Sequence, residues 1–99
     1  MKKTNKNVNL SLQVVPINEE NSYPIIDEAI AVIQTSGVKH IVNPFATVLE
    51  GELSELLNIV INAKDAALNA GAEELLLNIQ IHLKKDKSVS FEDKTDKYK

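Results

Sequence analysis

The residues best suited to do chemistry lie between Asn43 and Glu52, where the sequence reads NPFATVLEGE. The pattern predicts a tight turn, a short apolar strand that ends on the carboxylate of Glu50, and a helix that begins after Gly51. A helix N-terminus offers unpaired N–H groups, glycine lets a backbone approach a ligand closely, and Glu50 supplies a fixed hydrogen-bond acceptor. We therefore expect a binding site here; the alternative is a solvated or helix-capping glutamate.

The rest of the chain carries no residue pattern typical of catalysis or of metal binding. There is no cysteine, so thiolate catalysis, Fe–S ligation and cysteine-based zinc sites are excluded. Ser11 and Ser54 have no neighbouring base, and the lone His82 is more simply a structural residue than a metal ligand. We expect no catalytic residue, no metal ligand and no cofactor.

Composition is that of an ordinary globular protein and weakens two classes of function. The 99 residues are 43% hydrophobic with a net charge of −3, which suits one small domain. The chain has lysine but no arginine, and 4% of its residues are aromatic. We therefore do not expect nucleic-acid recognition by arginine forks and stacked rings. No apolar run is long enough for a signal peptide or a membrane span. We expect a soluble, cytoplasmic protein.

Charge and polarity divide the chain into three parts. Residues 1–7 are polar and basic and are predicted to be a disordered N-terminus. Residues 8–84 hold the periodic apolar segments and are predicted to form a ligand-binding domain. Residues 85–99 are dominated by Lys, Asp and Glu and are predicted to be a mobile tail with room for one helical turn. Its side chains suited to docking are Val89, Phe91 and Tyr98.

The predicted elements follow the order strand, helix, strand, strand, helix, strand. Residue patterns place strands at 8–15, 38–42, 47–49 and 75–83, and helices between Ser22 and Gly37 and between Gly51 and Gly71. This order is typical of the ferredoxin-like βαββαβ fold, an α+β sandwich in which two helices cover one face of a four-stranded antiparallel sheet. We expect the first and last strands to be central neighbours in that sheet.

Apolar spacing also predicts which side chains face the core. In the first helix these are Ile26, Ala29, Ile30 and Ile33. In the second helix they are Leu53, Leu56, Leu57, Val60, Ala63, Ala67 and Leu68. In the last strand they are Leu75, Leu77, Ile79, Ile81 and Leu83.

The sheet face away from the helices is predicted to be uncharged along its long strands. No charged residue occurs between Val8 and Ile17 or between Leu75 and Leu83, although exposed strands usually carry charges that prevent association. The outward residues are Asn9, Ser11, Gln13, Val15, Leu76, Asn78, Gln80 and His82. Such a face suits a buried polar interface, so we expect copies to associate sheet to sheet; a mildly polar solvent face is the alternative.

Three segments resemble a known family, the small thiamine-binding proteins related to the YkoF-type binders of thiamine and its hydroxymethylpyrimidine part. They are LQVVPI at 12–17, NPFATVLEGE at 43–52 and AGA at 70–72. The resemblance runs from about Val8 to Lys84 and implies a ferredoxin-like subunit, dimers that pair into tetramers through their sheets, and a non-catalytic pocket. Ala46 departs from the family pattern, because relatives commonly have glycine there.

The ligand that this resemblance implies gives each candidate residue a role. Thiamine carries an aminopyrimidine, whose edge needs a donor and an acceptor, and a cationic thiazolium. We expect Glu50 to accept from the pyrimidine edge, and Phe45 or Tyr23 to lie against a ring. The predicted ligand-binding residues are Glu50, Thr47, Asn43, Gln13, Phe45, Tyr23 and Ser22.

The leading hypothesis is therefore a binding protein for thiamine or hydroxymethylpyrimidine that acts as a carrier, buffer or sensor. One alternative is a structural or regulatory module that recruits a partner protein through its neutral face, and another is an amino-acid sensor of the ACT type. An enzyme such as an acylphosphatase ranks last, because that chemistry uses an arginine and the chain has none.

Overall fold

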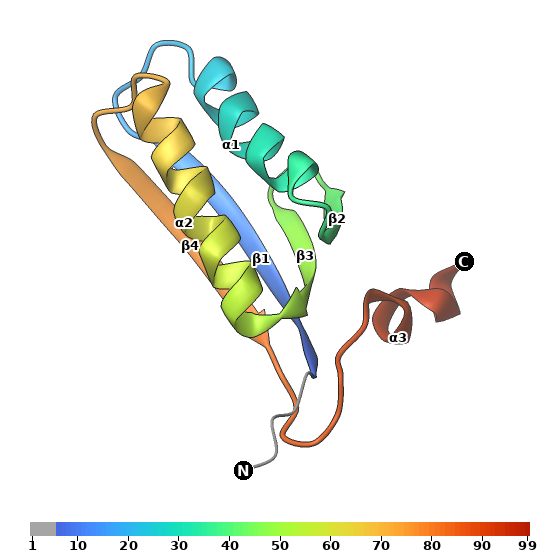
Figure 1. Cartoon of the computed structure of the whole chain (residues 1–99). Coiled ribbons are helices and arrows are strands. Elements are labelled where there is room, and N and C mark those ends of the chain that lie inside the picture. The colour runs from blue at the N-terminus through green and yellow to red at the C-terminus, as the bar shows by residue number, and fades with distance from the viewer. Residues whose placement is uncertain (1–5) are drawn as a thin grey trace.

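The computed structural model describes residues 6–99, in which four antiparallel strands form one sheet in the order β2-β3-β1-β4. Figure 1 shows α1 and α2 together on one face of this sheet and α3 apart from them, near the C-terminus. The predicted ferredoxin-like fold class is confirmed. The elements are β1 (Asn7–Pro16), α1 (Tyr23–Thr35), β2 (Lys39–Val42), β3 (Thr47–Glu52), α2 (Leu53–Asn69), β4 (Leu75–His82), α3 (Phe91–Thr95) and a 3₁₀ turn (Asp96–Tyr98).

The strand order corrects one prediction about the sheet. β1 and β4 are neighbours as expected, paired from Asn9 with His82 to Pro16 with Leu75. However, β4 lies at the edge of the sheet, and the two central strands are β1 and β3. The expectation that the last strand is central was wrong, because β1 has β3 on its other side and no strand follows β4 to cover its outer edge.

The first strand begins earlier in the chain than predicted. Residues 1–5 of the predicted disordered segment 1–7 lie outside the described residues. Asn7 already belongs to β1, where it pairs with Glu52 of β3. The first strand is therefore longer at its N-terminal end than the predicted 8–15.

The core lies between the two helices and the sheet. Val8, Leu10 and Leu12 of β1 alternate toward the helices and are nearly inaccessible to solvent. In α1 the buried residues are Ile25, Ala29 and Ile33, so Ile25 takes the place predicted for Ile26 and Ile30, which are half-buried. In α2 the buried residues are Leu56, Ile59, Val60, Ala63 and Ala67. Leu57 and Leu68, which were predicted to face the core, are 39% and 41% exposed.

The edge position of β4 exposes part of its apolar side. Leu75 and Leu77 pack partly against the core as predicted. Ile79 and Ile81 pair with Leu12 and Leu10 and lie on the helix side of the sheet as predicted, but they are 41% and 42% exposed, and Leu83 is 55% exposed. Within residues 6–99 no strand pairs with the outer edge of β4, and the helices bury only the beginning of this strand.

The face of the sheet opposite α1 and α2 is called the open face below. Strand pairing puts on it the alternate residues Lys39 and Ile41 of β2, Val48 and Glu50 of β3, Asn9, Ser11, Gln13 and Val15 of β1, and Leu76, Asn78, Gln80 and His82 of β4. The contributions of β1 and β4 are neutral, as the sequence predicted. The charged residues among these are Lys39 of β2 and Glu50 of β3.

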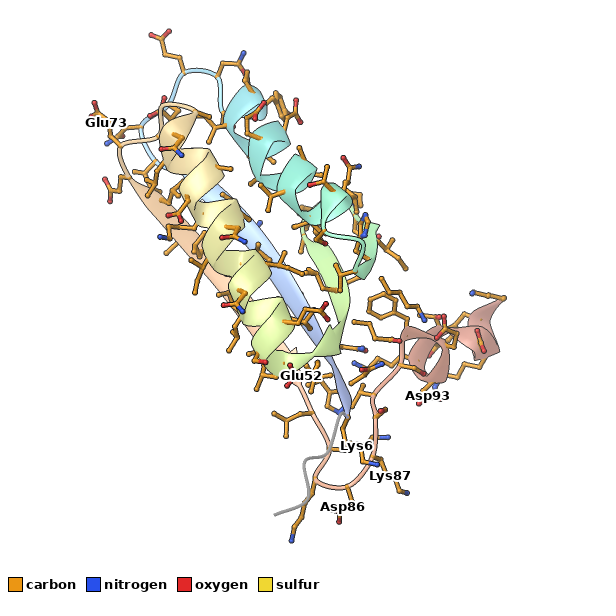
Figure 2. The ribbon with its side chains drawn as sticks, in the orientation of Figure 1. Lys6, Glu52, Glu73, Asp86, Lys87 and Asp93 are labelled. Carbon is orange, nitrogen blue, oxygen red and sulfur yellow. The ribbon has the colours of Figure 1, made fainter. Side chains whose placement is uncertain are left out.

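Charged side chains also mark the two ends of the molecule. Figure 2 shows Glu73 at the end where α2 leads into β4. Lys6, Asp86 and Lys87 lie at the opposite end, where β1 begins and the chain leaves β4. Among residues 6–99, no helix is long and apolar enough to cross a membrane.

Candidate functional site

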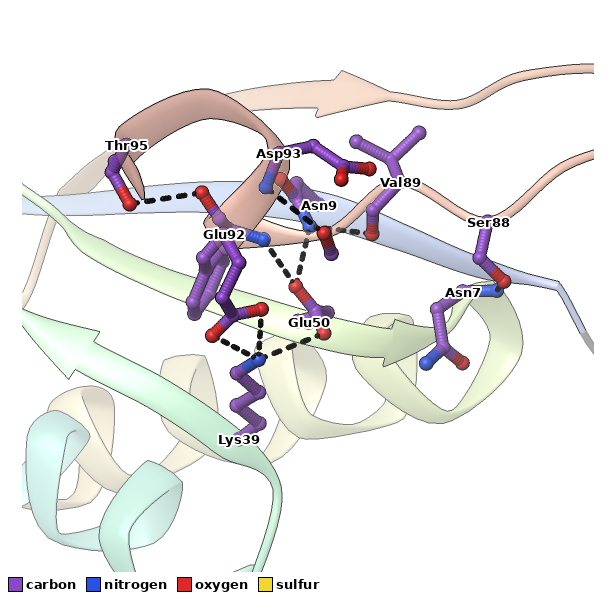
Figure 3. A network of polar contacts seen from close by, with 11 residues as sticks. Asn7, Asn9, Lys39, Glu50, Ser88, Val89, Glu92, Asp93 and Thr95 are labelled. Carbon is purple, nitrogen blue, oxygen red and sulfur yellow. Dashed lines mark hydrogen bonds and ion pairs between the residues drawn. The ribbon is translucent and has the colours of Figure 1, made fainter. Parts of the chain in front are cut away.

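The chain after β4 returns to the open face and crosses one end of it. The crossing segment, residues 88–91, is called the strap below. The Val89 N–H donates to the Asn7 carbonyl over 2.9 Å, and the Asn7 N–H donates to Ser88 Oγ over 2.9 Å. The side chains of Val89 and Phe91 are buried, at 1% and 8% exposed. The strap therefore docks beside the start of β1, and Figure 3 shows it on the side of the strands away from α1 and α2.

A helix cap explains why the chain turns after the strap. Ser90 is the N-cap of α3, and its Oγ accepts a hydrogen bond from the Asp93 N–H over 3.1 Å. Glu92 and Asp93 lie in the first turn, where carboxylates favour the positive end of the helix. Tyr98, the third predicted docking residue, is 77% exposed. The predicted helical turn is present, and the mobility of this tail stays a prediction.

A buried carboxylate connects the strap to the sheet. Glu50 is 8% exposed, and its Oε1 accepts hydrogen bonds from the Phe91 N–H over 2.6 Å and from Asn9 Nδ2 over 3.3 Å. Its Oε2 lies 3.2 Å from Lys39 Nζ. Asn9 Nδ2 also donates to the Val89 carbonyl over 3.1 Å. Figure 3 shows these contacts converging on Glu50, so both oxygens of this predicted site residue have partners within the chain.

Lys39 is the cation of this network. Its Nζ contacts both carboxylate oxygens of Glu92 at 2.7 Å and lies 5.3 Å from the centroid of the Phe91 ring. The hydrogen bond to Lys39 lowers the pKa of Glu92 below its ordinary value. The same hydrogen bond is the main cause that raises the pKa of Lys39, and the contacts with Glu50 raise it further. Lys39 therefore connects β2 to α3 as well as to Glu50.

Docking of α3 is expected to weaken in acid. Because folding lowers the pKa of Glu92, its ion pair stabilises the docked state fully above pH 4.5, the ordinary pKa of this group. That contribution is lost as the pH falls through the lower pKa of the folded state. NMR amide shifts of residues 92–95, followed from pH 6 to pH 3, should report the change. Glu92→Gln is the control, and an identical acid transition in this variant would contradict the assignment.

Gly51 has a packing role at the start of α2. It is buried in β3 opposite Val8. A Cβ at this position would lie 3.1 Å from Glu55 Oε1, 3.2 Å from Leu56 Cδ2 and 3.4 Å from Val38 Cγ2. The missing side chain therefore makes room for neighbouring side chains of the protein itself. The expected close approach to a ligand at Gly51 stays a prediction.

A cavity of about 600 Å³ lies against the open face and one side of α3. Its walls are mostly apolar, with several neutral polar groups and one lysine. The lining residues are Asn9, Leu10, Ser11, Ile41, Asn43, Val48, Gln80, Ile81, His82, Phe91, Lys94 and Thr95. Within residues 6–99 no group of three or more His, Asp or Glu residues is arranged to hold a metal ion.

A second cavity, of about 190 Å³, lies where the turn between β2 and β3 meets α1. It brings together five of the seven residues predicted to bind a ligand, namely Gln13, Tyr23, Asn43, Phe45 and Thr47. Thr47 is buried, whereas the rings of Tyr23 and Phe45 are 74% and 83% exposed. Asn43 lines both cavities, and Glu50 and Ser22 line neither. Ser22 caps α1 by position only, because its side chain makes no capping hydrogen bond.

Asn9 holds the strap, and Ser11, Gln80 and His82 line the larger cavity. The sequence pattern had assigned all four to an interface between copies. The signal that the sequence did offer was at Ser90, because Ser-Phe-Glu-Asp at 90–93 is an N-cap pattern that predicts an ordered helix start.

The chain matches a known protein family along most of its length. The model of a family described as "Thiamine-binding protein" matches residues 10–99. A protein of Clostridium perfringens from the uncharacterised family UPF0045 is 33% identical over 92 residues, which are 92% of this chain and 96% of the relative.

Solved structures agree with the fold. A domain of unknown function (DUF77) from Bacillus cereus has a TM-score of 0.91 at 40% identity, over 96% of this chain and 92% of that chain. A protein from Thermotoga maritima, described as a putative thiamine biosynthesis/salvage protein, has a TM-score of 0.85 at 31% identity. That match covers 94% of this chain and 99% of the other.

Proposed function

Because this chain belongs to the thiamine-binding protein family, we propose that it binds thiamine or the hydroxymethylpyrimidine part of thiamine without catalysing a reaction. The description of the Thermotoga maritima relative supports a thiamine-related role. The observation that carries the proposal is the cavity of about 600 Å³ on the open face. Sites for small molecules usually have volumes of about 300–1,000 Å³. The cavity of about 190 Å³ falls below this range.

The lining of the larger cavity suits a flat heteroaromatic ligand. Ile41 and Val48 of the sheet supply apolar surface for a ring. Neutral hydrogen-bonding groups, including Asn43 and Gln80, are available to orient polar atoms at the ring edge. Asn43 is the predicted ligand-binding residue that lines this cavity, and it also lines the smaller cavity beside α1. The ligand-binding roles of Gln13, Tyr23, Phe45 and Thr47 remain part of this proposal.

The proposed unit is an assembly of several copies of this chain, a dimer of dimers. The part of the open face beyond the strap keeps its neutral side chains, and Leu76 there is 51% exposed. β4 leaves a further apolar surface uncovered, where Ile79 and Ile81 are 41% and 42% exposed. An uncharged edge strand with exposed apolar residues favours association with another chain. A second copy is the partner that we propose.

Isothermal titration calorimetry with thiamine and with hydroxymethylpyrimidine tests the proposed function. We expect saturable binding at a fixed ratio per subunit. Val48→Trp should abolish binding, because Val48 lines the cavity and the indole would fill it. Ile61→Trp is the control, since Ile61 lies on α2 outside the cavity lining and the proposed interface and is 50% exposed.

The outcomes separate the competing functions. Light scattering on the same sample should give a multiple of the 10.9 kDa chain mass. A folded assembly that binds neither compound would contradict the proposal and favour the protein-interaction module. Equal binding by Val48→Trp and the wild-type protein would remove the larger cavity from the site.

A further inference from the structure

Asn9 and Glu50 together hold the backbone of the strap. Asn9 Nδ2 donates to the Val89 carbonyl over 3.1 Å, and Glu50 Oε1 accepts from the Phe91 N–H over 2.6 Å. The donor and the acceptor of this pair lie 3.3 Å apart. The pair can therefore bind any group that presents an acceptor beside a donor. In this structure the Val89 carbonyl is the acceptor and the Phe91 N–H is the donor.

The aminopyrimidine of thiamine presents the same pattern on its edge. A ring nitrogen accepts a hydrogen bond, and the adjacent exocyclic amino group donates one. We propose that Asn9 and Glu50 bind this edge when the strap lifts off, so that the strap competes with the ligand for its site. The inference rests on the proposed function. It adds Asn9 as the donor beside Glu50, whose contact with the pyrimidine edge was already expected, and it adds the strap as the segment that regulates access to the pair.

The location of the pair supports this assignment. Asn9 lines the larger cavity, and Phe91 of the strap forms part of its wall. Release of the strap would open the cavity toward the buried Glu50 carboxylate. A ring that enters from the cavity would then meet the donor and the acceptor side by side. Lys39 contacts the other oxygen of Glu50 and is 45% exposed, so its contact does not block the pair.

Docking of the strap leaves one buried group unsatisfied. The Nδ2 atom of Asn9 faces Glu50 Oε1 and the Val89 carbonyl, both of which only accept hydrogen bonds, so the orientation of the amide is fixed. Asn9 Oδ1 is then buried without a hydrogen-bond partner within residues 6–99. An unpaired buried acceptor opposes docking. The strap is consequently a poorer partner for Asn9 than water or a ligand that also donates to Oδ1.

The first test weakens the docking of the strap while leaving Asn9 and Glu50 unchanged. Val89→Asp puts a charge at a side chain that is 1% exposed and should undock the strap. We expect thiamine to bind this variant about tenfold more tightly in calorimetry, the factor for a site that is open about one-tenth of the time in the wild-type protein. Tyr98→Asp is the matched control on the same tail, because Tyr98 is 77% exposed, and should bind like the wild type.

The second probe checks the hydrogen-bond pattern. In the 4-oxo analogue of thiamine, the donor and the acceptor of the pyrimidine edge are exchanged. We expect both the wild-type protein and Val89→Asp to bind this analogue at least about tenfold more weakly than thiamine, because each mismatched buried hydrogen bond leaves a polar group unpaired. Equal affinity for the two compounds would overturn the role of the pair.

A measurement on the wild-type protein keeps the inference testable if Val89→Asp does not fold. Without ligand, hydrogen exchange at the Phe91 amide should be about tenfold slower than for an unprotected amide, because this N–H donates to a buried carboxylate while the strap is docked. Saturating thiamine should accelerate that exchange. Thiamine binding with an unchanged Phe91 amide would overturn strap competition and leave the proposed function standing. Failure of both the wild-type protein and Val89→Asp to bind thiamine would overturn both proposals.

Discussion

Leu56→Ala is expected to lower the free energy of unfolding by about 2–5 kcal/mol, the range for buried leucines that leave a cavity. Leu56 is 0% exposed in the middle of the core, and its Cδ2 atom packs against Gly51 of β3. A domain of this size typically has about 5–15 kcal/mol in total, so the loss is a large share of its stability. Urea denaturation followed by far-UV circular dichroism measures it.

Leu57→Ala is the matched control for this prediction. Leu57 follows Leu56 in α2 and is 39% exposed. Both substitutions replace leucine by alanine inside one helix, so the change in helix propensity is the same and the difference reports burial. We expect a loss below about 1 kcal/mol, as for most exposed positions. Equal losses in the two variants would mean that α2 does not face the core as the structure has it.

These two leucines also show what apolar spacing can predict about a helix. Adjacent apolar residues, such as Leu56 and Leu57 or Ile25 and Ile26, each fit a helical stripe. The sequence pattern cannot choose between them, since the choice depends on how the helix rotates against its neighbours. In the structure, α1 packs against α2 as well as the sheet, which buries Ile25 rather than Ile26. The existence and type of each helix followed from local pattern, and its rotation came from tertiary packing.

Strand order was a second quantity that depended on the whole fold. Alternation along 75–83 predicted the strand itself correctly. The same alternation predicted that Ile79 and Ile81 would be buried, because a strand pattern carries no information about whether a helix covers each residue. Their exposure follows from the edge position of β4, which is a property of the sheet.

The candidate site likewise has a part that the local sequence predicted and a part that depends on the whole fold. The motif from Asn43 to Glu52 located a cavity-forming turn and a buried carboxylate. Two partners of that carboxylate, Asn9 and Phe91, come from opposite ends of the chain, each 41 residues from Glu50 in sequence. No local pattern predicts such a contact. The charged composition after Lys84 indicated a solvated tail, and the burial of Val89 and Phe91 depends on an acceptor that only the folded sheet provides.

Glu50→Leu is expected to detach the strap and α3 from the open face. The change removes the acceptor of the Phe91 N–H and one of the two acceptors of Asn9 Nδ2, and a buried donor left unpaired costs about 1–3 kcal/mol. Undocking lets water satisfy both donors, so the loss of stability is limited to the free energy of docking. We expect the core to stay folded, the Phe91 amide to exchange rapidly with solvent, and trypsin to cleave faster after Lys94.

Glu50→Gln separates a structural role of Glu50 from a direct contact with the ligand. The glutamine oxygen still accepts from the Phe91 N–H and from Asn9, whereas its amide loses the charge that pairs with Lys39. The Phe91 amide should therefore remain protected in this variant. If Glu50 binds the ligand as predicted, thiamine binding should weaken by about 1.5–3 kcal/mol, the range for hydrogen bonds to a charged group. Unchanged affinity with a docked strap would confine Glu50 to holding the tail, whereas weaker binding with a docked strap would identify the carboxylate as a ligand contact.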